Sequence, residues 1–167
     1  MALRRILRDE LRVLDALLYT HRNAHGRTQY YQRLTTIRGS VRVLCEHHPS
    51  SQPRPTDGPI EDGERFVSDL CKRAGHLHAS VGLCDRLGVD IARACRYLLM
   101  LIGQSYFMPF ALTMMAVCGR IRTLTKQMRA TFCGTFRKEY ARLAALRASG
   151  VCGVCGGPEA VAAELQR

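Results

Sequence analysis

Apolar residues recur along most of this chain at steps of three and four positions, which is the spacing that places them on one face of an α-helix. The first stripe, in residues 2–20, consists of Leu3, Leu7, Leu11, Leu14 and Leu18, widened by Ile6, Val13 and Leu17. The second, after residue 28, consists of Tyr30, Leu34, Ile37, Val41 and Leu44. Gly26 can end the first helix and Thr28 can cap the second. The pattern predicts an antiparallel helix hairpin.

Residues 46–63, EHHPSSQPRPTDGPIEDG, interrupt this pattern with four prolines and two glycines. So polar a run predicts an exposed loop. Beyond the loop, the apolar spacing predicts a helix over residues 66–84, although Gly75 and Gly82 lower the helix propensity of this segment. The spacing predicts helix again from about Asp90 through Leu101.

Pro109 predicts a helix boundary or kink near residue 108. After it, an apolar stripe continues to about residue 140 on Val117, Ile121, Leu124, Met128, Phe132 and Phe136. We therefore expect an all-α fold: a helical bundle built on the N-terminal antiparallel hairpin and a long C-terminal helix. Residues 1–147 are expected to form a single helical domain, followed by a Gly- and Cys-containing tail over 148–167.

Residues 97–118 carry no charge, and 22 residues are enough to span a bilayer. The stretch also contains Gly103, Gln104, Ser105, Pro109 and Thr113, and polar groups in mid-span are unfavourable in lipid. The residues therefore favour a buried helical hairpin or kinked helix in a protein core over a membrane span.

The charge of the chain is strongly basic. It has 25 basic and 14 acidic residues, a formal net charge of +11, and 22 of the basic residues are arginine. Guanidinium groups pair bidentately with phosphate and stack on bases, so nucleic acid is the partner class that this composition favours. The excess lies at the two ends, +6 in residues 1–44 and +8 in residues 91–167, and we expect these two segments to converge in the fold.

Residues 119–147 hold the longest basic block, with one acid, Glu139. Arg122, Lys126 and Arg129 fall at i, i+4 and i+7 on one helical face, close to Arg120. Like charges at this spacing repel one another and destabilise a helix unless a partner neutralises them. The block therefore favours an RNA-binding face over a merely solvated one.

The segment YTHRNAHGR, residues 19–27, follows the first helix with two histidines, an asparagine and two arginines. His21 and His25 stand four apart, as in some zinc sites, but no glutamate and no third ligand accompany them. The simplest interpretation is a helix-ending turn with exposed or locally bonded histidines. The alternative is contact with a polyanion by His21, Asn23, His25 and Arg27, supported by Arg33 and Arg38 on the next helix.

The eight cysteines lie mostly inside apolar helical patterns, which is typical of buried, reduced thiols. Cys152 and Cys155 form a C-x-x-C pair that would need two further ligands to hold zinc, so a plain tail is favoured. No serine-histidine-acid series, paired-carboxylate pattern or phosphate-cradling glycine loop is present. We therefore expect no enzyme activity, no metal and no cofactor.

Two blocks carry a family resemblance: LRVLDALLYTHRNAHGRTQYYQRLTTIRGSVRVL and YFMPFALTMMAVCGRIRTL. The first resembles the N-terminal signature of the nucleolus and neural progenitor protein family, related to the small protein subunit of ribonuclease MRP. In that family a leucine-rich helix leads into a Tyr and an Asn-x-His-Arg box, and the second block is similar to an aromatic-proline run ending in Arg-Ile-Arg. The box falls on Asn23 and His25, with Arg27 one residue beyond the usual arginine, while Ala24 and Gly26 replace the usual glutamine and arginine.

This resemblance implies a non-catalytic subunit of ribonuclease MRP, located in the nucleolus of the nucleus. Such a chain would bind and brace the catalytic RNA, beside other protein subunits, during precursor ribosomal RNA processing. Two alternatives stay open. One is an organellar ribosomal or ribosome-assembly protein, although Asp9 and Glu10 are unusual in a mitochondrial presequence. The other, less favoured, is a small membrane protein inserted through residues 97–118.

Overall fold

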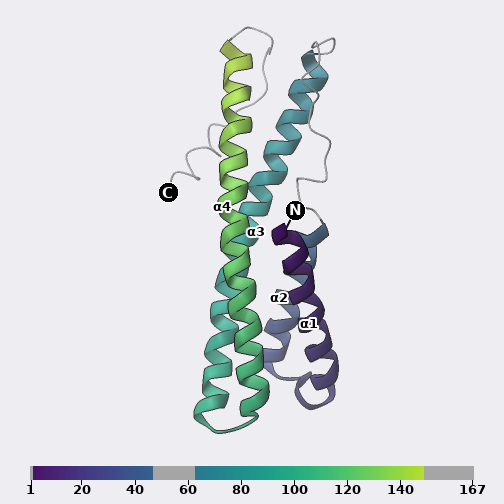
Figure 1. Cartoon of the computed structure of the whole chain (residues 1–167), viewed down its shortest axis with the longest axis vertical. Helices are drawn as coiled ribbons and strands as arrows, with labels where there is room; N and C mark the ends of the chain where they lie inside the picture. The colour runs from purple at the N-terminus through teal and green to yellow at the C-terminus, as the bar shows by residue number, and fades with distance from the viewer. Residues whose placement is uncertain (1, 47–62, 149–167) are drawn as a thin grey trace. The chain divides into compact units, whose positions relative to one another are not determined.

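The structure, a computed structural model, describes residues 2–46 and 63–148, with side chains from residue 66 to 145 in the second range. These residues form four α-helices and no strand: α1 (Ala2–His25), α2 (Gln29–Glu46), α3 (Gly63–Gly103) and α4 (Met108–Ala148) (Figure 1). The predicted all-α class and helical bundle are therefore confirmed. Most of the predicted 46–63 loop and the 148–167 tail lie outside the described residues.

The chain divides into two compact units. Unit 1 consists of residues 1–48 and 82–128, and therefore contains α1, α2, the second part of α3 and the first part of α4. Unit 2 consists of residues 49–81 and 129–167. The units divide after residue 81, inside α3, and after residue 128, inside α4. Each of these helices therefore contributes to both units.

The predicted hairpin of α1 and α2 forms in unit 1. The Tyr31 hydroxyl donates to the Leu18 carbonyl at 2.6 Å near the turn, and Arg4 Nε donates to the Cys45 carbonyl at 2.6 Å near the open end. Pairing an early residue of one helix with a late residue of the other makes the hairpin antiparallel (Figure 1).

The core of unit 1 is built from the predicted stripes. Leu7, Leu14, Leu34 and Ile37 are fully buried, and α3 and α4 add Leu87, Ile91, Leu98, Met114 and Ile121. Ile6 and Val13 do not widen the first stripe as expected, because both remain more than 40% exposed on the outer face of α1. Each buried aliphatic side chain contributes about 2 kcal/mol through removal of apolar surface from water.

The predicted interruption between residues 84 and 90 is wrong, because α3 is continuous. Cys84, Leu87, Ile91 and Ala94 are all buried and continue one helical stripe through this region. A glycine inside a helix costs about 1 kcal/mol relative to alanine, and burial of a single leucine exceeds that. Gly88 is therefore accommodated without ending the helix.

A tight turn joins α3 to α4, close to the boundary that Pro109 predicts. The Tyr106 amide donates to the Leu101 carbonyl at 3.0 Å and the Ser105 amide to the Ile102 carbonyl at 2.9 Å. This pair of bonds is the Schellman arrangement at a helix C-terminus, which requires a left-handed residue at the position of Ser105. Ser105 indeed has φ 57°, and Phe107 follows with φ 50°. The turn therefore keeps two non-glycine residues in a strained conformation.

Replacing Ser105 by glycine should stabilise the protein by about 1 kcal/mol, because glycine has no Cβ to oppose a left-handed backbone. The melting temperature should rise by roughly 2–4 °C. Ser40→Gly is the matched control: Ser40 lies inside α2, so the same substitution there should lower the melting temperature. A Ser105→Gly variant that melts no higher than the native protein would contradict the strain argument.

The described part of unit 2 consists of two helical segments, one from α3 and one from α4. Its core contains Val67, Leu70, Leu77, Phe132 and Phe136. Phe136 stacks on Tyr140, with ring centroids 6.1 Å apart. A buried ion pair between Arg73 and Glu139 lies beside these apolar residues.

Candidate nucleic-acid interface

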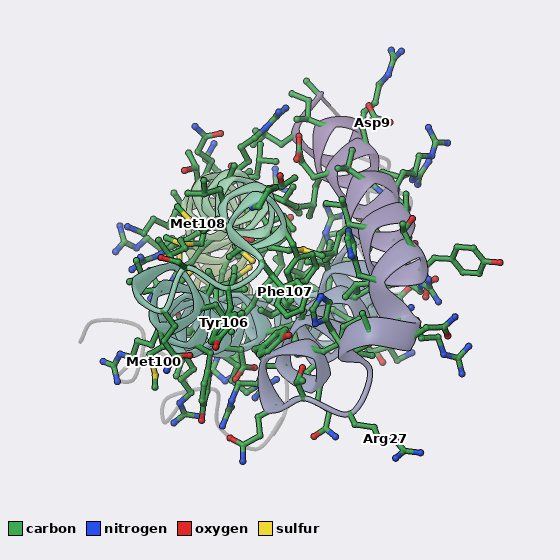
Figure 2. All side chains as sticks on the ribbon, turned by 90° about the horizontal axis from the view of Figure 1, so that it is seen from below. Asp9, Arg27, Met100, Tyr106, Phe107 and Met108 are labelled. Atoms are coloured by element: carbon green, nitrogen blue, oxygen red, sulfur yellow. The ribbon has the colours of Figure 1, made fainter. Side chains whose placement is uncertain are left out.

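The segment 19–27 contains both exposed and buried side chains. Arg22, Asn23 and Arg27 are exposed, whereas His21 is half-buried and His25 is buried. The backbone ends α1 at His25, as the sequence predicts. Figure 2 shows Arg27 reaching away from the helices at this end of unit 1. Asn23 and Arg27 therefore lie at the surface, and their contact with a polyanion stays a prediction.

Of the two expected states, exposed or locally hydrogen-bonded, His25 takes the second, because it is buried and bonded within the turn. Its side chain is 2% exposed, and its ring stacks on Phe110 at 4.7 Å and meets the edge of Phe107 at 4.5 Å. A hydrogen bond of 2.6 Å joins His25 Nδ1 to the Tyr30 hydroxyl. Because residues of α2 and α4 enclose the ring, His25 is a packing residue of the turn and does not reach a ligand at the surface.

The electrostatics of His25 agree with this position. Burial, and to a lesser extent the neighbouring His21, lower the pKa of His25 below its ordinary value of 6.5. His21 packs against the same ring of Phe110, with centroids 4.6 Å apart. At neutral pH His25 is therefore an uncharged ring within an aromatic cluster.

Gly26 and Thr28 shape the turn. A Cβ at Gly26 would lie 2.6 Å from the Arg22 carbonyl oxygen, which is too close, so glycine is required for this approach. Thr28 occupies the capping position, since its carbonyl accepts from the Gln32 amide at 3.1 Å. Its hydroxyl, however, donates to the His25 carbonyl at 2.7 Å and does not accept from α2. The hydroxyl therefore ties the two helix ends together.

Arg33 and Arg38, two predicted RNA contacts on α2, interact with other side chains of unit 1. The Arg33 guanidinium carbon lies 5.6 Å from the centre of the Tyr97 ring on α3, whose hydroxyl donates to Gln29 Oε1. Arg38 Nε lies 3.7 Å from Asp15 Oδ1. Both side chains are half-buried, so much of their binding capacity is used within the fold.

Arg120 is also engaged inside the protein. One of its terminal nitrogens lies 2.5 Å from Glu10 Oε1, and the Glu10 side chain is only 5% exposed. A buried carboxylate without a partner is costly, so Arg120 compensates Glu10. This role explains why α4 needs a basic residue here independently of any ligand. Arg120 contributes less free positive charge than the sequence indicates.

Arg122 and Lys126 of unit 1 both present exposed side chains. Along the same stretch of α4, a shallow groove of about 380 Å³ is lined by Ala116, Gly119, Arg120, Thr123, Leu124 and Gln127. Ala116, Gly119 and Thr123 are the small residues of this lining, and Arg122 and Lys126 belong to the same stretch of α4 without lining the groove. Arg129, the third predicted member of this face, is exposed and belongs to unit 2.

Arg122 also influences a cysteine pair in the core of unit 1. A hydrogen bond from Cys118 lowers the pKa of Cys95 to about 7, against the opposing effect of burial, and Arg122 adds a smaller lowering. The same bond and burial raise the pKa of Cys118. Both cysteines are free thiols; Cys118 is buried, as predicted for a residue within an apolar helical pattern, whereas Cys95 is half-buried.

The sequence offers two pairs of potential zinc ligands, His21 with His25 and Cys152 with Cys155. Among the described residues, no group of three or more histidine, cysteine, aspartate or glutamate side chains could hold a metal ion. Cys152 and Cys155 lie outside the described residues, so the interpretation of this pair stays a prediction.

Sequence reasoning missed an exposed apolar patch around the α3–α4 turn. The patch, called the turn patch below, consists of Leu99, Met100, Tyr106, Phe107, Met108 and Leu112, all exposed. Figure 2 shows Tyr106, Phe107 and Met108 at the end of unit 1 that also carries Arg27. A signal was available: Pro109 places a turn just before it, and turns are exposed, so aromatic residues at 106 and 107 could not both be buried.

None of the described helices contains a stretch long and apolar enough to cross a membrane, including the region of the uncharged 97–118 segment.

Comparison of the chain with family models, with curated proteins and with solved structures found no match.

Proposed function

We propose that this chain is a non-catalytic RNA-binding subunit of a ribonucleoprotein. The family resemblance points to ribonuclease MRP as that particle, where the chain would brace the catalytic RNA beside other protein subunits during precursor ribosomal RNA processing in the nucleolus. In this proposal, side chains of α4 and of the α1–α2 turn contact the phosphate backbone of the RNA.

One observation carries the proposal: the uneven charge of unit 1. Its residues include fifteen basic and six acidic side chains, a formal excess of +9. Residues 16–45 and 91–128 contain no aspartate or glutamate at all. These segments supply α2 up to Cys45, the whole α1–α2 turn and the part of α4 in unit 1. A surface with so few acids attracts a polyanion over its whole extent.

The described ion pairs sharpen this argument. Glu10 is buried against Arg120, and Asp15 faces both Arg38 and Arg42. Asp9 pairs with Arg12, so three of the six acids are committed to arginines of the α1–α2 hairpin and α4. They do not neutralise Arg122, Lys126 or Arg27. Phosphate contacts by Arg and Lys position a protein on RNA without reading its sequence, which suits a bracing role.

The test is the salt dependence of binding to a stem-loop RNA. Replacing Arg122 and Lys126 together by alanine should weaken binding and flatten the slope of log affinity against log salt by about one for each residue, because fewer counterions are released. Fluorescence anisotropy titrations over a series of salt concentrations would measure both quantities.

Arg12→Ala with Lys72→Ala is the matched control. It removes the same charge, but Arg12 and Lys72 each pair with an exposed aspartate, at 3.1 and 3.5 Å. This control should keep a slope close to that of the native protein. Equal slopes for the native protein and the Arg122/Lys126 variant would show that this face only meets solvent.

The particle itself is identified by recovering the tagged protein from cells and sequencing the RNA bound to it. Enrichment of the ribonuclease MRP RNA is the expected result. Enrichment of organellar ribosomal RNA would instead support the alternative assignment and overturn the particle named here.

A further inference from the structure

The turn patch stands out among the exposed apolar residues of the described chain. Eleven large apolar residues are exposed, and six of them fall within positions 99–112. Single exposed apolar side chains are ordinary, but six of them around one helix turn mark a candidate binding surface. Tyr106 and Phe107 are 62% and 56% exposed, so both aromatic rings are open to a ligand.

The backbone of the turn that carries these two rings is well defined. The Tyr106 amide is bonded to the Leu101 carbonyl, and the residues on either side of it, Ser105 and Phe107, are both left-handed. The edge of Phe107 also meets the buried His25 ring at 4.5 Å. Residues held in strained conformations persist where the surrounding structure determines them, often at binding sites. The turn therefore presents preorganised aromatic rings.

The charges at this end of unit 1 select the partner. The α1–α2 turn and the α3–α4 turn lie at the same end of the unit (Figures 1 and 2). Arg22 and Arg27 are exposed on the first turn, and Arg96 is exposed on α3. No acidic residue occurs in either segment that forms this end, 16–45 or 91–128. A second copy of the chain would bring the same positive charge, so self-association is disfavoured.

From this arrangement we propose that the turn patch is a stacking platform for unpaired bases of RNA, with Tyr106 and Phe107 as the rings and Arg22 and Arg27 as phosphate contacts. The inference rests on the proposed RNA-binding function and adds that the ligand is single-stranded at this point. Proteins that bind single-stranded RNA combine a cationic surface with aromatic rings on which successive bases stack. Duplex RNA hides its base faces and would contact only the cations.

The experiment compares Tyr106→Ala, Tyr106→Phe and Tyr106→Leu on two probes of equal charge. One is an unstructured RNA oligonucleotide containing 2-aminopurine, and the other is a blunt RNA duplex. Tyr106→Ala should weaken binding to the unstructured RNA about tenfold and leave duplex binding nearly unchanged. The native protein and Tyr106→Phe should quench the 2-aminopurine fluorescence, because a stacked base is quenched, and Tyr106→Ala should not.

Tyr19→Ala is the matched control, since Tyr19 is an isolated tyrosine that is 82% exposed on α1. It should bind both probes as the native protein does. If Tyr106→Leu keeps native affinity for the unstructured RNA, apolar contact and not stacking holds the RNA, and the platform is wrong. If Tyr106→Ala keeps native affinity and quenching, the platform is also wrong.

The outcomes distinguish the two proposals. If Tyr106→Ala binds the unstructured RNA as tightly as the native protein, while the Arg122/Lys126 variant shows a flattened salt slope, the platform alone is overturned. Failure of the native protein to bind either probe would overturn both. Circular dichroism melting of each variant checks the fold, and Tyr106→Ala should melt close to the native protein because its side chain is mostly exposed.

Discussion

Replacing Arg73 by alanine should destabilise the protein by about 3 kcal/mol, even though the change removes only one ion pair. Arg73 and Glu139 have side chains that are 10% and 7% exposed, and Arg73 Nε lies 3.6 Å from Glu139 Oε1. Without Arg73, Glu139 would remain buried with only Arg142, whose side chain is 59% exposed, at 3.7 Å. A poorly compensated buried charge is the main cost. Chemical denaturation of the variant and the native protein measures it.

The double variant Arg73→Met with Glu139→Leu should recover most of this loss. Arg73 Nε, Arg73 Nη1 and Glu139 Oε2 have no hydrogen-bond partner in the described structure, so the native pair does not fully offset its desolvation. Two apolar residues of similar volume would pack among Leu70, Phe132 and their neighbours without that cost. Stability within about 1 kcal/mol of the native protein, or above it, is expected.

The cycle of single and double variants decides between two accounts. If the pair stabilises the fold outright, the double variant should be at least as unstable as Arg73→Ala. If it is tolerated only because each charge needs the other, the single variants are unstable and the double variant is not. Glu139 is buried and pairs with Arg73 and Arg142, both in unit 2, so these ion pairs do not connect it to Arg122 or Lys126.

The helices could be predicted from the sequence because they depend on local spacing. The stripes through Leu14 and Ile37 are buried as expected, and Gly26 and Pro109 mark real helix ends. The error at residues 84–90 arose because a glycine's local cost is visible in a sequence, whereas the burial of Leu87 and Ile91 that outweighs it is a tertiary effect.

The site was harder to predict because its residues are defined by distant partners. Arg120 seemed free until α1 brought the buried Glu10 to it from 110 positions away in the chain. The polar neighbours of His25 in the sequence leave open whether it is exposed or locally bonded, and the packing of Phe107 and Phe110 against the ring decides this. Asn23, Arg27, Arg122 and Lys126 needed no such partner, and the structure places them at the surface.

His25→Ala should cost about 3 kcal/mol of stability, because it removes an enclosed ring and leaves the Tyr30 hydroxyl without the partner at 2.6 Å. His25→Phe keeps the ring volume and should cost less. The difference between the two variants in chemical denaturation separates the packing of the ring from its hydrogen bond.

The stability should also depend on pH through this residue. Burial lowers the pKa of folded His25 below the 6.5 expected when it is unfolded, so the unfolded chain binds the proton more readily. The His25 contribution is therefore complete above pH 6.5, declines as the pH falls from 6.5 toward the lowered pKa, and is constant below it. His25→Phe should lose less stability than the native protein between neutral and mildly acidic pH.

The His25→Phe variant also tests whether the segment 19–27 contacts RNA through His25. Because the His25 ring does not reach the surface, His25→Phe should bind stem-loop RNA as the native protein does, while Asn23→Ala, at an exposed position beside it, should not change stability. Identical pH dependence in the native protein and His25→Phe would show that His25 is not the residue that titrates. Loss of RNA affinity in His25→Phe without loss of stability would show that the ring contacts RNA directly, and the packing role assigned to it would be wrong.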